Sequence, residues 1–135
     1  MIHQLTFLRI SSGLTMLLAH GYPKLQKYSQ LSTVFPDPLG IGSSLSLTLV
    51  IFAEVLCSLL LVLGISVRLV AFPLMITMAV AFFVFHGSDP FAKKELALLF
   101  LMIFTTLFIG GGGAYTAPSL KINTENRFLS WLLEN

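Results

Sequence analysis

Four long apolar segments constrain the fold of this chain more than any other feature. They cover about residues 5–22, 44–63, 69–85 and 90–109. Each is close to the roughly 20 apolar residues that cross a ~30 Å hydrocarbon core as a helix. The 135 residues are also 56% hydrophobic and only 10% charged, which is unusual for a soluble protein. We therefore expect an all-α fold, a transmembrane four-helix bundle that forms a single domain over residues 1–135.

Short polar segments set the expected helix ends. Pro23 should end the first helix, because proline has no amide hydrogen for the helical ladder. Residues 64–68, "GISVR", leave room only for a tight antiparallel hairpin between the second and third helices. Asp89 and Pro90 indicate an N-cap followed by proline at the first position of the fourth helix. Residues 110–113, four glycines, should end that helix.

The tail, the charge and the cysteine content indicate the expected partners. Residues 124–134 place Phe128, Trp131 and Leu132 on one side of a short helix, which predicts an amphipathic helix at the membrane interface. A net charge of +2 is too small to indicate nucleic-acid binding. The single cysteine, Cys57, excludes an intrachain disulfide. The partners we expect are the lipid bilayer, other membrane or redox proteins, and further copies of the chain.

Polar residues interrupt the apolar segments at helical spacing. Arg9, His20 and Lys24 fall on one stripe of the first helix, and Arg68 and His86 are five turns apart on the third. Four residues should meet in an opening at the loop side, the end opposite the termini: His20, Lys24, His86 and Glu95. The expected ligand is a quinone or similar amphiphile, with haem or a metal as the weaker alternative. Simple contact of the histidines with interfacial water is the remaining interpretation.

Glu54 lies in the middle of the second segment, roughly 15 Å from either end by helical rise. A carboxyl at that depth needs a partner or must be neutral. We expect Arg9 to pair with Glu54, and a protonated Glu54 is the alternative. Together with Arg68, these residues would form either a clasp that fixes the helix order or a proton path.

The order of these residues resembles the DoxX family of small four-helix membrane proteins. Arg9, "HGYPK" after the first helix, Glu54 in "FAEVL", "GISVR", His86 and "GGGGAYTAPS" follow one another up to about Pro118. The resemblance implies a protein of a bacterial-type inner membrane with cytoplasmic termini. In some members it implies quinone-coupled sulfur oxidation, such as thiosulfate:quinone oxidoreductase, and in others partnership with redox or thiol-stress systems.

Three functions remain open at this point. The leading expectation is a small subunit or accessory protein of a membrane redox system, at most a subunit of a quinone-linked oxidoreductase. The second is a membrane assembly or scaffold protein without enzymatic activity. The third and weaker one is a small-solute or proton transporter with Glu54 as the carrier, although the chain shows no inverted repeat of broken helices.

Overall fold

The computed structural model describes residues 2–117 and 125–133, and this part of the chain contains helices and no strand. The all-α class is as predicted. The first long helix consists of α1 (Ile2–Thr15), η1 (Met16–Gly21) and α2 (Tyr22–Gln26), and the second of α4 (Ser43–Ile51), η2 (Phe52–Cys57) and α5 (Ser58–Leu63). The third consists of α6 (Val67–Ala79) and η3 (Val80–Phe85), and the fourth is α7 (Phe91–Gly110). Two short helices, α3 (Tyr28–Leu31) and α8 (Arg127–Leu133), complete the described part.

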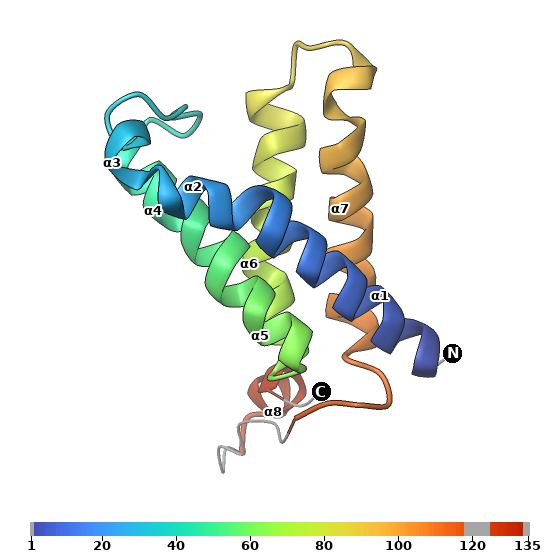
Figure 1. Ribbon diagram of the computed structural model, residues 1–135. Helices are drawn as coiled ribbons and strands as arrows, with labels where there is room; N and C mark the ends of the chain where they lie inside the picture. Colours follow the sequence, from blue (N-terminus) through green and yellow to red (C-terminus); the bar gives the residue numbers. More distant parts are fainter. Residues whose placement is uncertain (1, 118–124, 134–135) are drawn as a thin grey trace.

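The long helices alternate in direction and cross at different angles (Figure 1). The first helix crosses the others diagonally, α6 and α7 stand side by side as a hairpin, and α8 lies below the turn between α5 and α6. The core lies where α6 meets α5, η2 and α7, and its fully buried side chains include Leu61, Leu74 and Phe104. Burial of such side chains is what holds the helices together below the loop side.

Within the described part of the chain, two helices are long and apolar enough to cross a membrane, Ser43–Leu63 and Val67–Phe85. The first and fourth helices are of similar length but carry more polar residues, among them Arg9 and His20 on the first and Lys93 on the fourth. Many large apolar side chains lie exposed on the outside of the helices, including Phe7 and Ile109. Apolar surface of that extent is typical of contact with lipid or with other proteins.

Pro23 does not end the first helix, which corrects the predicted end at residue 22. The helix continues to Gln26, with Pro23 in the first turn of α2. Just before it, the Tyr22 amide donates to Leu17 O, five residues back, so the turn is wider than an α-turn. Proline is tolerated there because a residue in a first helical turn needs no hydrogen-bonded amide.

Asp89 does not cap the fourth helix, which is a second correction. α7 begins at Phe91, and its capping residue is Pro90, which makes no side-chain cap hydrogen bond. The Asp89 carboxylate instead accepts a hydrogen bond from His86. It lies one residue too early in the chain to reach the amides at the start of α7.

The predicted glycine-rich end of the fourth helix is confirmed. α7 ends at Gly110, and Gly111 follows with φ of 79°. Gly113 has φ of 86°, and a side chain there would lie 2.5 Å from both Ile2 O and Thr6 Oγ1. The glycines therefore both stop the helix and let the following segment approach the start of α1.

The tail helix packs against the end of the α6–α7 hairpin. The Trp131 ring lies 5.3 Å from that of Phe108, and the guanidinium of Arg68 lies 4.9 Å from the Trp131 ring centre. The helix covers Arg127–Leu133, while residues 124 and 134 of the predicted range lie outside the described residues. Its position at a membrane interface stays a prediction.

Candidate functional site

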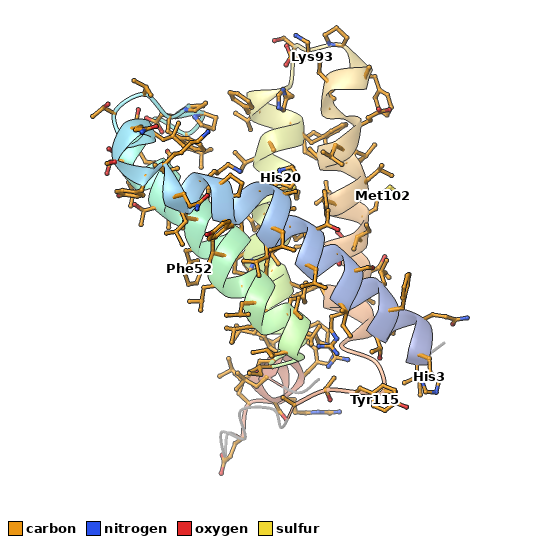
Figure 2. The ribbon with its side chains drawn as sticks, in the orientation of Figure 1. His3, His20, Phe52, Lys93, Met102 and Tyr115 are labelled. Atoms are coloured by element: carbon orange, nitrogen blue, oxygen red, sulfur yellow. The ribbon has the colours of Figure 1, made fainter. Side chains whose placement is uncertain are left out.

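A cavity of about 420 Å³ lies at the loop side of the helices. Most of its lining is apolar and comes from all four long helices, including Met16, Leu49, Ile76 and Phe100, and from the loop that precedes α4. Its polar lining residues are His20, Lys24, Ser46, Glu54, Thr77, His86 and Lys93. In Figure 2, His20 lies where the first helix crosses in front of α6. An apolar cavity with a few convergent polar groups is the usual form of a small-molecule site.

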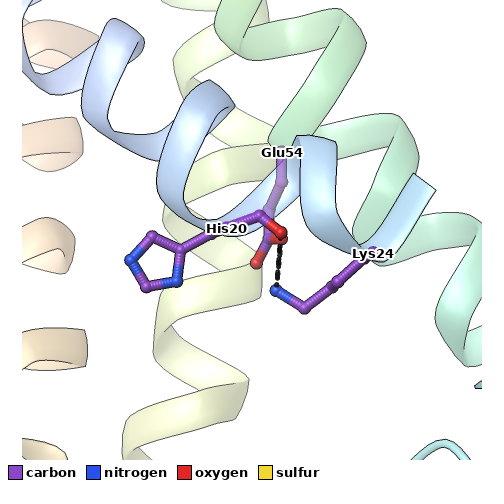
Figure 3. Close-up of polar contacts among 3 residues, drawn as sticks. All are labelled: His20, Lys24 and Glu54. Atoms are coloured by element: carbon purple, nitrogen blue, oxygen red, sulfur yellow. Dashed lines mark hydrogen bonds and ion pairs between the residues drawn. The ribbon is translucent and has the colours of Figure 1, made fainter. Parts of the chain in front are cut away.

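The charged centre of this cavity is an ion pair between Lys24 and Glu54. Lys24 Nζ lies 2.5 Å from Glu54 Oε2 and donates more weakly to the main-chain oxygen of His20 at 3.4 Å (Figure 3). The Glu54 side chain is 5% exposed and that of Lys24 is 24% exposed. Lys24 therefore reaches from the end of the first helix to the middle of the second, and neutralises a carboxylate that cannot reach the surface.

Arg9 does not pair with Glu54, so the predicted partner of Glu54 is wrong. Arg9 Nη1 donates to Leu61 O at 2.8 Å and Val62 O at 2.9 Å, and Nη2 donates to Tyr115 O at 2.5 Å. Leu61 is seven residues beyond Glu54, about 10 Å by helical rise. The last carbonyls of a helix lack intrahelical partners. The carbonyl oxygens of Leu61 and Val62, at the end of α5, accept the hydrogen bonds of Arg9. The Arg9 side chain therefore does not extend to Glu54.

The predicted cluster of Arg9, Glu54 and Arg68 is therefore not formed. Arg68 donates to Trp131 O at 3.3 Å and stacks on that ring, at the end of the bundle near the termini. Arg9 is nonetheless a clasp, because it joins α1 to the end of α5 and to the segment after α7. Glu54 belongs to the loop-side cavity instead, with Lys24 as its partner.

The two histidines enter the cavity from different helices. The His86 Nδ1 atom donates to Asp89 Oδ2 at 2.7 Å, and this hydrogen bond lowers the pKa of Asp89 below its usual range. A neutral His86 that donates from Nδ1 keeps its Nε2 lone pair as an acceptor. His20 packs edge-on against Phe100 with ring centres 5.9 Å apart. Three of the four residues predicted for the opening, His20, Lys24 and His86, thus line one cavity.

Glu95 is the fourth predicted residue, and the structure places it outside the cavity. Glu95 is exposed on α7, whereas Lys93 lines the cavity. The two residues are two positions apart, which is roughly 200° around a helix at 3.6 residues per turn. The missed signal was the spacing of Lys93, Leu96, Ala97 and Phe100, which form one helical stripe and all line the cavity.

The loop before α4 also lines the cavity and was missed. Asp37 holds it in place: Oδ1 accepts hydrogen bonds from Ser46 Oγ at 2.7 Å and Ile41 N at 3.0 Å, and Oδ2 accepts one from Gly42 N at 2.7 Å. These bonds, that from Ser46 above all, lower the pKa of Asp37. The loop's apolar lining residues are Phe35, Pro36, Pro38, Leu39 and Ile41.

Three π-helical segments surround the cavity. The amides of Tyr22, Ser58 and His86, which follow η1, η2 and η3, each donate to a carbonyl five residues back. His20 lies in η1, Glu54 lies in η2 and His86 directly follows η3. π-helical turns are rare, and they occur frequently at functional sites. Their coincidence with the polar lining is a second reason, independent of the cavity, to regard this end of the bundle as the functional site.

Among the described residues no group of three or more His, Cys, Asp or Glu side chains is arranged to hold a metal ion. The polar lining offers both hydrogen-bond donors and acceptors.

Comparison with known proteins identifies the family of the chain. No curated protein and no solved structure matches it. The family model described as DoxX matches residues 4–87, more than half of the chain. The matched range contains His20, Lys24, Glu54 and His86, whereas Lys93 lies beyond it. Together with the two apolar helices, the match supports a membrane protein, and the chain belongs to the DoxX family.

Proposed function

We propose that this protein is a small membrane subunit or accessory protein of a redox system, and that it holds a quinone or similar amphiphile in the loop-side cavity. One observation carries the proposal: largely apolar space of about 420 Å³ ends at a buried Lys24–Glu54 ion pair beside His20. The size is within the range of roughly 300–1,000 Å³ that small-molecule sites occupy. A buried ion pair often stabilises a fold no more than apolar residues of similar volume would. Its presence in such a space therefore favours a role in ligand binding or in fixing one packing arrangement.

The chemistry of the lining suits a quinone head group. A quinone ring presents two carbonyl acceptors, and the ammonium of Lys24 and the ring nitrogen of His20 are potential donors in the same cavity. A bound quinone would supply two-electron, two-proton chemistry, for which a partner redox protein would deliver the electrons and water at the loop-side end the protons. Glu54 and His86 would offer acceptors for hydrogen bonds from the hydroxyls of the reduced ring. The apolar lining accommodates the ring faces and the start of the chain.

All four long helices would span the membrane under this proposal. The first, residues 2–26, is about 37 Å long and α7 is about 30 Å long by helical rise, enough for a ~30 Å core. The lysines of α7 lie near its loop-side end, where such side chains can extend to the interface. Arg9 has its hydrogen bonds inside the protein. The family suggests a bacterial-type inner membrane and cytoplasmic termini.

Native mass spectrometry of protein gently extracted from membranes tests the proposal. We expect the wild-type protein to retain a quinone, and His20→Ala and His86→Ala to retain about tenfold less. A lost hydrogen bond of about 1.4 kcal/mol has that effect. His3→Ala is the matched control, because His3 lies against Tyr115 with ring centres 5.7 Å apart and does not line the cavity.

The outcomes separate the candidate functions. Equal retention by all three histidine variants, each with an unchanged circular dichroism spectrum and melting temperature, would remove the proposed site. A wild-type protein that carries only phospholipid would refute the quinone and favour the scaffold or transport function. A larger redox protein retained with the quinone would identify the partner.

A further inference from the structure

We infer that the ligand enters this cavity from the membrane, through a lateral opening between α4 and the third long helix, and that its apolar chain lies in that opening. The inference rests on the proposed function, because it concerns the same cavity. It adds the route of the ligand, the membrane leaflet that supplies it and the orientation in which it binds.

The wall of the cavity reaches the outer surface at several positions, and the two deepest lie on α4 and on the third long helix. Leu49 on α4 and Ile76 on α6 both line the cavity, yet they are 49% and 45% exposed. The other exposed apolar lining residues lie nearer the loop-side ends of their helices or in the loop itself: Phe85, Leu96, Leu39 and Ile41. Leu49 and Ile76 therefore mark the deepest part of the edge of the wall. Below these positions η2 packs against α6, whereas the loop-side ends of α4 and the third helix diverge (Figure 1).

The depth of the opening indicates that it faces lipid chains rather than water. Leu49 lies six residues from the start of α4, about 9 Å by helical rise, and Ile76 lies nine residues before the end of η3, about 14 Å. Both helices are among the segments apolar enough to cross a membrane. Half of a ~30 Å hydrocarbon core is about 15 Å thick. The opening therefore lies in the loop-side leaflet.

The polar and apolar groups of the cavity set the orientation of the ligand. The Lys24–Glu54 pair and His20 are on the inner wall, and the edges of the opening are the apolar Leu49 and Ile76. A space of about 420 Å³ encloses a ring head group and the beginning of a chain, not a long prenyl chain. The head group thus binds at the ion pair and the remainder of the chain passes out between α4 and α6.

Tryptophan substitutions at the edge of the opening test this route. Leu49→Trp and Ile76→Trp add bulk where the chain would pass. Leu45→Trp and Phe72→Trp are the matched controls, because both residues are exposed, lie about one turn away on the same helices and do not line the cavity. The assay follows, by native mass spectrometry, the uptake of deuterated ubiquinone and menaquinone from vesicles into the reconstituted protein. We expect uptake to slow about tenfold in the two edge variants and to be unchanged in the controls.

A second measurement uses the wild-type protein and does not depend on how the variants fold. A ubiquinone with a photoreactive diazirine on its chain should cross-link to α4 and α6, near Leu49 and Ile76. The lateral route would be overturned by cross-links to the loop at residues 35–41 or to Lys93, or by equal uptake in edge and control variants. In either case a bound quinone would still support the proposed function. A wild-type protein that takes up neither quinone would overturn both. Uptake of vesicle phospholipid alone would overturn the quinone as the occupant.

Discussion

Removing the charge of Lys24 should destabilise the protein more than removing the charge of Glu54, although the two residues form one ion pair. The Glu54 side chain is 5% exposed and lies in the middle of its helix, so in Lys24→Met its carboxylate stays buried without a partner. In Glu54→Gln the ammonium that remains is on a 24% exposed side chain near a helix end. Such a side chain can turn towards the interface.

The structure gives the expected size of this asymmetry. Breaking a buried pair by removing one partner costs about 3–5 kcal/mol, and Lys24→Met should lose about 3 kcal/mol of unfolding free energy. Glu54→Gln should lose about 1–2 kcal/mol, because its partner can be hydrated. In the double variant no charge remains to be paired, so it should lie within about 1 kcal/mol of wild type. The coupling energy, which is the sum of the two single losses minus the loss in the double variant, is then about 4 kcal/mol.

Reversible unfolding in mixed dodecyl maltoside and SDS micelles, followed by far-UV circular dichroism, measures these free energies. Lys27→Met is the matched control: Lys27 is exposed just beyond α2 and should change stability by less than about 0.5 kcal/mol. Additive effects of Lys24→Met and Glu54→Gln, with coupling below about 0.5 kcal/mol, would refute the ion pair as a buried structural element.

Three further changes probe other contacts of the fold and the site. Arg9→Lys should lower the free energy of unfolding by about 3 kcal/mol in the same assay, because one ammonium cannot replace a guanidinium that donates to carbonyls of two separate segments. A loss below about 1 kcal/mol would show that Arg9 does not hold these segments together. Gly21→Ala should lower the free energy of unfolding by about 1–3 kcal/mol, because the new methyl group would collide with the main-chain oxygen of Glu54. An unchanged melting temperature would show that η1 and η2 do not pack so closely. The pKa of Asp37 is lowered in the fold, so the stability that its hydrogen bonds give the loop should be fully present above the ordinary carboxyl pKa of about 3.9. It should be lost as the pH falls through the lowered pKa of the folded protein. Amide exchange at residues 41–46, corrected for intrinsic rates, should show that loss in the wild type, and pH-independent protection there would contradict it.

Hydropathy was sufficient to locate the long helices but not the contacts of the buried charges. The predicted segments 44–63, 69–85 and 90–109 agree with the observed helices to within two residues at each end. Helical rise also placed Arg9 within reach of Glu54, yet it could not show that the carbonyls of Leu61 and Val62, at the end of α5, lie closer. Which acceptor an arginine finds depends on how the helices cross, and a single sequence does not contain that angle.

The position of a residue around its helix was the other limit. Lys93 and Glu95 are equally polar and two residues apart, so polarity alone does not decide which of them faces the cavity. Lys93 does, because it shares a helical stripe with the lining residues Leu96 and Phe100. The π-helical segments add to this difficulty. One extra residue in a turn rotates everything beyond it by about 100°. Their composition is as apolar as the α-helical turns beside them, so hydropathy does not reveal the rotation.

Shortening η3 by one residue should therefore disrupt the ligand site while the fold stays intact. Deleting Val84, which is exposed and does not line the cavity, should turn η3 into regular α-helix and rotate His86 by about 100° away from the cavity. The loop at residues 87–90 can absorb the change before α7 begins. We expect circular dichroism and melting temperature close to those of Val84→Ala, with quinone retention reduced about as much as in His86→Ala. If the deletion variant retained quinone as well as Val84→Ala does, the π-helical geometry would have no part in placing His86. If it instead failed to fold, η3 would be a requirement of packing rather than of the site.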